Sequence, residues 1–306
     1  MDRRTFLRHA ACGVAGAALA PLTLVGQGPA SRPEPWFRIS LAQWSLHRRL
    51  FGRAEPKLDP LGFAAAARGF GIDAIEYVNQ FYRERVRERG LGAALRQRAK
   101  DHGVQSLLIM CDGDGALGDP DAAARARAVE NHRKWLELAA DLGCHAIRVN
   151  AASQGARDEQ ERLAADGLRR LCEVADGFRL SVLVENHGGL SSDGAWLAAV
   201  MKRVAHARIG TLPDFGNFTV AKGQDYDRYR GVEELLPFAR AVSAKSYEFD
   251  AKGDETTIDY LRMLRLVRAA GYRGHVGIEY EGGRLDEAAG ILATKQLLER
   301  VCERLA

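Results

Sequence analysis

Residues 181–189 read SVLVENHGG, and this stretch decides the fold because a largely apolar run ends abruptly in polar residues. The run 181–184 shows no regular alternation of apolar and polar residues, which is typical of a parallel strand covered on both faces. Glu185, Asn186 and His187 follow at the carboxyl end of that strand. The stretch therefore predicts a buried strand that ends in a functional site.

Two later stretches have the same design. Residues 209–213, IGTLP, lead into Asp214, and residues 275–278, HVGI, lead into Glu279. Together with Glu185, these two acids stand at the ends of three parallel strands, which suggests that three carboxylates share one metal ion.

Outward from these stretches, short apolar runs alternate with amphipathic helical patterns, and eight such pairs are present. The strands are expected at 37–46, 74–79, 105–112, 146–151, 181–185, 209–214, 241–249 and 275–279. Helical patterns at 121–142 and 258–270 are typical of what lies between them. Eight βα units predict the α/β class and a single (β/α)8 barrel, also called a TIM barrel.

A doubly wound fold is the competing architecture. It would place a glycine-rich phosphate loop after its first strand, whereas residues 44–47 read WSLH. No linker or low-complexity tract divides the chain, and residues 31–306 approach the ~250 residues typical of a barrel. A second domain is therefore not expected.

The first residues depart from this pattern. Arg3 and Arg4 lie in a twin-arginine stretch, DRRTFLR, and a mildly apolar segment follows at 10–26. Small residues near Ala30 suit a signal peptidase, so we expect a signal peptide at 1–30 and the barrel at 31–306. Export by the twin-arginine translocase to the periplasm, or elsewhere outside the cytoplasm, would follow. An uncleaved anchor and a chance arginine pair are the alternatives.

Composition excludes several classes of partner. The chain has 306 residues, 46% hydrophobic and 27% charged, with a dispersed net charge of +4, so a nucleic-acid surface is not expected. Its five cysteines lack CxxC spacing, which argues against a disulfide framework or a cysteine-ligated zinc site. A homo-oligomer is compatible with the sequence.

Barrel active sites lie at the carboxyl ends of the strands, so polar residues there are the candidates. The catalytic candidates are Glu185, Glu279, His187 and Lys245. The substrate-binding candidates are Gln43, Trp44, Glu76, Asp112, Asn150 and Asn217. The metal ligands expected are Glu185, Asp214 and Glu279. Each has a structural alternative, such as packing for Trp44 and buried ion pairs for Glu76 and Asp112. Glu279 is preferred to Glu281 as a ligand because it follows the apolar run directly.

Four motifs give the chain a resemblance to the xylose isomerase-like barrel family of sugar-phosphate isomerases and epimerases. They are VENHGG at 184–189, LPDFGNF at 212–218, SAKSYEFD at 243–250 and GIEYEG at 277–282. The family includes hydroxypyruvate isomerase, tagatose 3-epimerase-like enzymes, inosose dehydratase and, more distantly, apurinic-site endonucleases. The resemblance covers about 37–305. It implies a divalent metal held by Glu, Asp, a His or Gln, and Glu, and Glu185, Asp214 and Glu279 match three of these ligands.

The fourth ligand position departs from the family pattern. Residues 243–246 read SAKS where relatives carry a neutral ligand. A protonated lysine has no lone pair to donate, so either His187 or water completes the shell, or the metal binds less tightly. Lys245 would then stabilise a developing enolate oxygen or bind an acidic substrate group.

Three carboxylates favour a hard ion, so Mn²⁺ or Mg²⁺ is expected, with Zn²⁺ or Co²⁺ as alternatives if His187 binds. The main hypothesis is a metal-dependent isomerase or epimerase of a sugar or keto-sugar, working through an enediolate. A lyase that eliminates from 3-keto-glycosides is the alternative. An abasic-site endonuclease and a non-catalytic sugar-binding barrel are further alternatives, and the eight histidines and dispersed charge disfavour the endonuclease.

Overall fold

The computed structural model describes residues 35–306, and the stretch 181–185 is β5, the central strand of the predicted site. The predicted signal peptide, 1–30, lies outside the described residues. The barrel strands are β1 (Arg38–Ala42), β2 (Ala74–Val78), β3 (Gln105–Met110), β4 (Ala146–Val149), β5 (Ser181–Glu185), β6 (Ile209–Leu212), β9 (Val242–Ser246) and β10 (His275–Tyr280). A short hairpin, β7 (Thr219–Ala221) and β8 (Gln224–Asp225), follows β6 and was not predicted.

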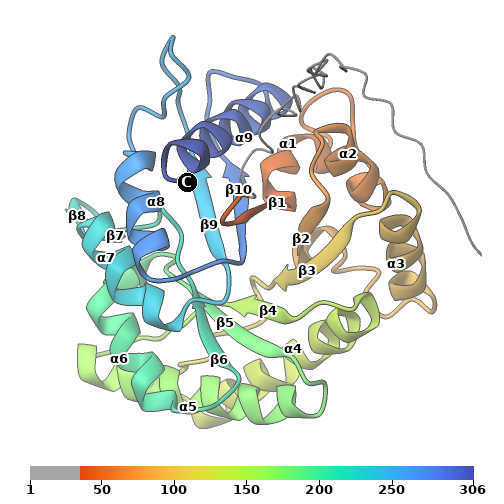
Figure 1. Ribbon diagram of the computed structural model, residues 1–306. Coiled ribbons are helices and arrows are strands. Elements are labelled where there is room, and N and C mark those ends of the chain that lie inside the picture. Colours follow the sequence, from red (N-terminus) through yellow and green to blue (C-terminus); the bar gives the residue numbers. More distant parts are fainter. Residues whose placement is uncertain (1–34) are drawn as a thin grey trace, which may run out of the picture. The chain divides into compact units, whose positions relative to one another are not determined.

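Helices separate the strands and lie around the outside of the barrel (Figure 1). They are α1 (His47–Leu50), α2 (Phe63–Gly69), α3 (Leu91–Asp101), α4 (Ala122–Leu142), α5 (Arg157–Asp176), α6 (Gly194–Val204), α7 (Arg228–Leu235), α8 (Tyr260–Ala269) and α9 (Glu287–Arg304). Short 3-10 helices lie at Gln43–Leu46, Pro60–Gly62, Asn79–Phe81, Gly189–Ser192 and Leu236–Phe238. Among residues 35–306, no helix has the length and apolar character needed to span a membrane.

The strands pair in the order β6-β5-β4-β3-β2-β1-β10-β9, and every pairing in this sheet is parallel. The ring closes between β6 and β9, where Asp214 bridges Ser243. Ser243 N donates to Pro213 O at 2.9 Å, and Phe215 N donates to Ser243 O at 3.1 Å. The predicted (β/α)8 barrel is therefore confirmed.

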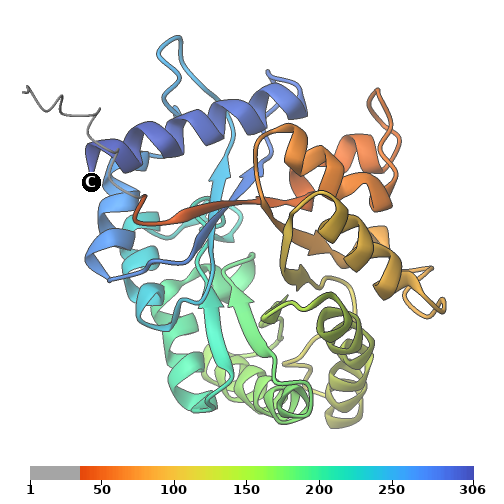
Figure 2. The same ribbon diagram turned by 45° about the vertical axis from the view of Figure 1, so that its right-hand side comes forward.

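The core accounts for the apolar runs of the sequence. Every residue of β2, β5 and β9 is buried, because each strand faces the barrel interior on one side and the surrounding helices on the other. Figure 2 shows this outer layer from a second direction, with α9 packed on β10. The carboxyl ends of all eight strands consequently open at one face of the barrel.

Most strands are shorter than the sequence predicted, and two end three or four residues early because side chains take over their hydrogen bonds. The strand expected at 37–46 ends at Ala42, since Ser45 Oγ donates to Ile278 O and accepts from Tyr280 N, both at 3.0 Å. The strand expected at 241–249 ends at Ser246, because the carboxylate of Glu255 accepts the next two backbone N–H groups at 3.2–3.3 Å.

The helix expected at 121–142 begins one residue later, and its first turn shows why. The Asp121 carboxylate accepts a hydrogen bond from Ala124 N at 2.6 Å and so caps the helix from outside it. At the other end Gly143 has a φ of 74°, a left-handed conformation that glycine adopts without strain. The chain then turns directly into β4.

Candidate active site and metal centre

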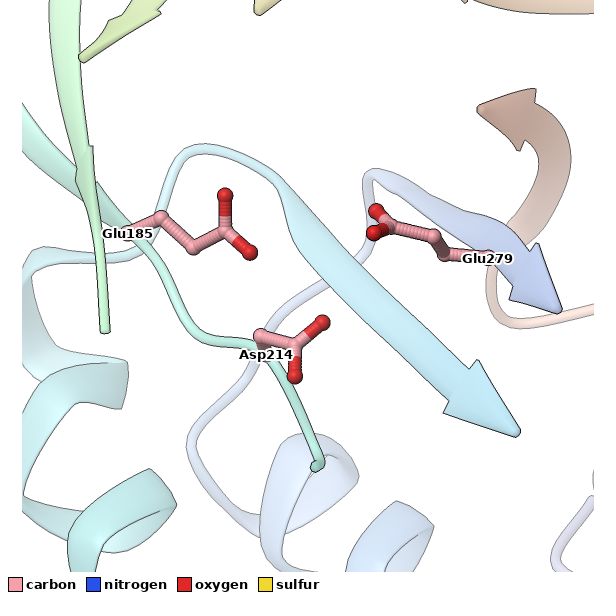
Figure 3. Close-up of side chains that lie close together, drawn as sticks. All are labelled: Glu185, Asp214 and Glu279. Atoms are coloured by element: carbon pink, nitrogen blue, oxygen red, sulfur yellow. The ribbon is translucent and has the colours of Figure 1, made fainter. Parts of the chain in front are cut away.

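Three carboxylates converge at the mouth of the barrel. Glu185 ends β5, Asp214 follows β6, and Glu279 lies in β10. Each is buried, and one oxygen of each lies within 4.8 Å of one oxygen of the other two. Figure 3 shows the three side chains pointing toward a common space from separate strands. We call Glu185, Asp214 and Glu279 the acidic triad.

A network of amide groups fixes the turn that carries Asp214. Its Oδ1 accepts hydrogen bonds from the backbone N–H groups of Gly216 and Asn217, both at 2.8 Å. The Asn186 side chain binds the backbone of Asp214 on both sides: Asn186 Oδ1 accepts from Asp214 N at 2.8 Å, and Asn186 Nδ2 donates to Asp214 O at 3.0 Å. Asp214 Oδ2 is left to face the other two carboxylates.

Glu185 is held by two side chains of different character. Asn217 Nδ2 donates to Glu185 Oε1 at 3.0 Å, and Arg148 Nε lies 2.7 Å from Glu185 Oε2. The Arg148 contact is an ion pair without hydrogen-bond geometry, so Oε2 is a buried oxygen that accepts no hydrogen bond among residues 35–306. It therefore keeps its capacity to bind a cation.

Glu279 is paired with the lysine of β9. Lys245 Nζ lies 2.6 Å from Glu279 Oε1 and 3.8 Å from Asp214 Oδ2. Ser243, two residues earlier on the same face of β9, donates from Oγ to Asp214 Oδ2 at 2.7 Å. Strand β9 thus presents a hydroxyl and an ammonium to the triad, at the position where the sequence led us to look for a fourth ligand.

The three carboxyl groups of the triad differ in how their pKa values are shifted. Burial raises the pKa of Glu185 well above its usual range, although Arg148 opposes this, and burial also raises the pKa of Asp214 to about 6. Burial also favours a higher pKa for Glu279, but the charge and the hydrogen bond of Lys245 outweigh burial and lower that pKa. Two of the three acids therefore lack sufficient positive charge nearby.

This arrangement fits a hard divalent cation. The donor set consists of carboxylate oxygens, and the Oε2 atom of Glu185 has no hydrogen-bond donor among the described residues. The raised pKa values of Glu185 and Asp214 indicate acids whose ionised form needs a counter-charge. Among residues 35–306 no histidine joins the three carboxylates, and the nitrogen beside Glu279 is that of Lys245, which has no lone pair to donate when protonated.

Four other predicted residues lie around the triad at the mouth. Asp112 Oδ1 accepts from Arg148 NH1 at 2.7 Å and from Asn150 Nδ2 at 2.8 Å. The other amide atom of Asn150, Oδ1, is buried and has no hydrogen-bond partner among residues 35–306. The Arg148 charge outweighs burial and lowers the pKa of Asp112 to about 2. His187 is exposed at the rim, and Trp44 Nε1 donates to the carboxylate of Glu281.

Two predicted substrate-binding residues lie inside the protein. Gln43 is fully buried, accepts from Val78 N at 2.9 Å and donates to Tyr82 Oη at 2.8 Å, so both ends of its amide are used. Glu76 accepts from Ser40 Oγ at 2.6 Å.

The carboxyl group of Glu76 lies deeper than the triad. A Cβ on Gly277, two residues before Glu279 on β10, would lie 2.5 Å from Glu76 Oε1. The glycine thus makes room for this acid in the barrel interior. Burial raises the pKa of Glu76 to about 7.

The structure adds residues to the site that the sequence analysis did not select. Arg148 joins Asp112 to Glu185, and Glu281 accepts from both Trp44 and Lys245. Tyr247 follows Ser243 and Lys245 at the same two-residue spacing, and that alternation on β9 could have identified it.

Comparisons with known proteins agree with this geometry. A family model described as "Xylose isomerase-like TIM barrel" matches residues 64–301. The chain is 23% identical over 203 residues to the L-ribulose-5-phosphate 3-epimerase UlaE of Escherichia coli K12, covering 62% of this chain and 69% of that protein.

Among solved structures, the apo 3-keto-D-glucoside 4-epimerase YcjR from E. coli superimposes with a TM-score of 0.68 at 16% identity, covering 86% of this chain and 99% of the other. A xylose isomerase-like TIM barrel protein from Mycobacterium smegmatis, in complex with magnesium, gives a TM-score of 0.65 at 16% identity, covering 88% and 98%. With its fold, its strand-end acids and a family model spanning most of its length in agreement, the chain belongs to the xylose isomerase-like TIM-barrel family.

Proposed function

We propose that this protein is a metal-dependent isomerase or epimerase of a keto-sugar, working by proton transfer next to the carbonyl group. The convergence of Glu185, Asp214 and Glu279 on one space carries the proposal. The similarity to UlaE, a sugar epimerase by name, supports the reaction class, and the magnesium complex of the M. smegmatis protein supports a divalent ion.

The acidic triad would hold the metal, with Asp214 Oδ2 and one oxygen each of Glu185 and Glu279 as ligands. When bound, a divalent ion there supplies positive charge that acidifies the C–H between a carbonyl and a hydroxyl group. We expect Mn²⁺ or Mg²⁺, because the donors are hard oxygen atoms.

Two carboxylates of this chain can exchange the proton. Glu185 and Glu279 come from β5 and β10, and their side chains point toward each other across the triad. A sugar lying between them would present opposite faces to the two acids, so one can remove a proton and the other can return it. Return to the other face of the same carbon gives epimerisation, and return to the neighbouring carbon gives isomerisation.

The remaining polar groups orient the reaction. Lys245 holds Glu279 ionised and brings a positive charge to the space where a substrate oxygen becomes negative. Asn150 has an oxygen without a partner in the described part of the chain, and Asn217 contacts Glu185, so both are suited to sugar hydroxyl groups. His187 is exposed at the rim, where it can contact the substrate or exchange protons with water.

Proton exchange in heavy water tests the proposal. The Mn²⁺-loaded protein is incubated with a panel of keto-sugars and 3-keto-glycosides, and deuterium next to the carbonyl is measured by NMR. We expect incorporation with wild type and a loss of turnover of roughly 10²–10⁴-fold in Glu279→Gln. Glu130→Gln, on the exposed face of α4, is the matched control and should retain activity. Product formed without deuterium would contradict the two-glutamate scheme.

Elimination from a 3-keto-glycoside is a second candidate, favoured by an aromatic surface near Trp44. Its indole and the rings of Phe51 and Phe81 form a cluster, with Phe51 and Phe81 centroids 4.9 Å apart and Phe51 39% exposed. Exposed rings of this kind suit the apolar face of a second sugar. Release of a free sugar or alcohol from a 3-keto-glycoside, read by chromatography, would distinguish elimination from epimerisation.

We also propose that the protein is exported by the twin-arginine route, on the strength of the Arg3-Arg4 pair and the apolar segment after it. Replacing both arginines by lysine should retain the precursor in the cytoplasm, as read by cell fractionation. Normal export of that variant would show that the pair is not a signal.

A further inference from the structure

Lys245 is a buried cation placed among the metal-binding acids. The side chain is 2% exposed, and Nζ lies 2.6 Å from Glu279 Oε1, 3.1 Å from Glu281 Oε2 and 3.8 Å from Asp214 Oδ2. Two of these three acids belong to the triad. The ammonium therefore already balances part of the charge that would attract a divalent ion.

Lys245 and Ser243 are the side chains that β9 directs at the triad. Strand β9 lies between β10 and the end of β6, with Lys245 level with Glu279 and Ser243 bridged to Asp214. Both side chains point at the acids. Neither is a strong ligand, because a protonated lysine has only donors and a neutral serine hydroxyl is a weak ligand.

The surroundings hold the lysine in this place. Glu281 accepts from Lys245 Nζ and from the indole N–H of Trp44, so the head group is tied to the first βα loop. The aliphatic part of the Lys245 side chain passes over Gly216, where a Cβ would lie 2.6 Å from Lys245 Cγ. A side chain at 216 would displace this aliphatic part, so the glycine permits this route.

We propose that Lys245 is a built-in competitor of the divalent ion, taking the place of the fourth ligand and weakening metal binding to the triad. The inference rests on the proposed function, since it assumes a metal at the triad. Two effects act together. The ammonium occupies the Glu279 Oε1 lone pair, and its charge repels a second cation across a few ångströms of protein interior. The ion is then held by three carboxylates and exchanges readily with solvent.

The test is Mn²⁺ affinity at one fixed pH, measured by electron paramagnetic resonance of free Mn²⁺. Lys245→Met removes the charge and adds no hard donor, whereas Lys245→Gln removes the charge and adds a neutral oxygen. We expect both to bind Mn²⁺ at least about tenfold more tightly than wild type, with Gln the tighter. Lys134→Met is the matched control, because Lys134 pairs with buried Asp114 outside the triad, 2.7 Å away, and its loss should leave the affinity unchanged.

Each outcome bears on the proposal. Affinity that is unchanged or weaker in both variants, or absent in all proteins, would overturn it. Tighter binding in Lys245→Gln alone would also overturn it, by showing that a missing donor and not the ammonium limits affinity. Binding by both variants with none by wild type would support it, while contradicting metal dependence in the proposed function, which the deuterium experiment tests separately. Circular dichroism verifies folding, and if Lys245→Met does not fold, an unchanged affinity in Lys245→Gln still overturns the proposal.

Discussion

Arg148 and Glu185 form a buried ion pair, with Arg148 Nε 2.7 Å from Glu185 Oε2. The same guanidinium donates through NH1 to Asp112 Oδ1 at 2.7 Å. One arginine from β4 thereby connects an acid that follows β3 with the acid that ends β5. Because Arg148 and Glu185 are both almost fully buried, this pairing determines how Glu185 faces the triad.

Removing the arginine charge should destabilise the protein strongly. In Arg148→Met both Asp112 and Glu185 would lose their cationic partner, and an uncompensated buried charge of this kind costs about 3–5 kcal/mol. Urea denaturation at pH 7 measures the free energy of unfolding. Arg208→Met is the control, because its partner Asp176 is 51% exposed and the expected loss is at most about 1 kcal/mol. Equal losses in the two variants would contradict the structural role given to Arg148.

Metal content should depend on Asp214 more than on any surface acid. Asp214→Ala removes a ligand from the triad, and we expect it to lose most of the Mn²⁺ found in wild type by elemental analysis after dialysis. The matched control is Asp225→Ala, an exposed acid of the β7–β8 hairpin. Equal metal content in the two variants would assign Asp214 a structural role, and a wild type whose activity survives chelation would contradict metal dependence.

Glu76 should make stability fall as the pH rises. Its pKa in the folded protein is raised to about 7 from the usual 4.5, so between these values the folded state binds a proton that the unfolded chain has lost. The free energy of unfolding contributed by this group is therefore greatest below pH 4.5 and declines toward pH 7, by at most about 3 kcal/mol.

Glu76→Gln isolates this effect because it keeps a carbonyl oxygen for Ser40. Relative to wild type, the variant should gain stability at pH 8 and show little change at pH 4.5, in urea denaturation at both values. A difference between the two proteins that does not vary with pH would show that Glu76 does not titrate in this range.

The barrel and the triad could be predicted from sequence because both depend on repeated local patterns. An apolar run that ends in Glu185, Asp214 or Glu279 reports a strand end directly, and parallel strand ends meet at one face. How deep a side chain lies in the barrel does not follow from such local patterns. Glu76 lies deeper because Gly277, 201 positions later, leaves space for it, and Gln43 is buried because the chain leaves β1 early to form a 3-10 helix.

The sequence also could not predict which residues of other strands pair with a given side chain. The role of Arg148 depends on Asp112 and Glu185 flanking it in space, and its own stretch, 146–151, carries no sign of either. The predicted strand 241–249 extended past its actual end at Ser246, so the prediction did not show that Tyr247 lies where β9 opens into the site.

Tyr247 offers the site a hydroxyl group without a hydrogen-bond partner in the described part of the chain. Its Oη makes no hydrogen bond within residues 35–306 and packs beside Gly216, where a Cβ would lie 2.5 Å away. After burial, which raises its pKa, the charges that act most strongly on this hydroxyl are those of Asp214 and Lys245, so it lies beside the triad. A half-buried hydroxyl in this place is suited to donate to a sugar oxygen.

Tyr247→Phe should therefore lower kcat/KM by about tenfold, the equivalent of one hydrogen bond of about 1.4 kcal/mol, without lowering stability, since no bond within the protein is lost. Tyr260→Phe provides the contrast, because its hydroxyl donates to the carbonyl oxygens of Ala244 and Lys245 at 3.0 and 2.8 Å. That variant should lose about 1 kcal/mol or more of unfolding free energy by leaving buried carbonyl groups unpaired. If Tyr247→Phe instead loses stability and keeps full activity, the hydroxyl has a structural role and does not contact the substrate.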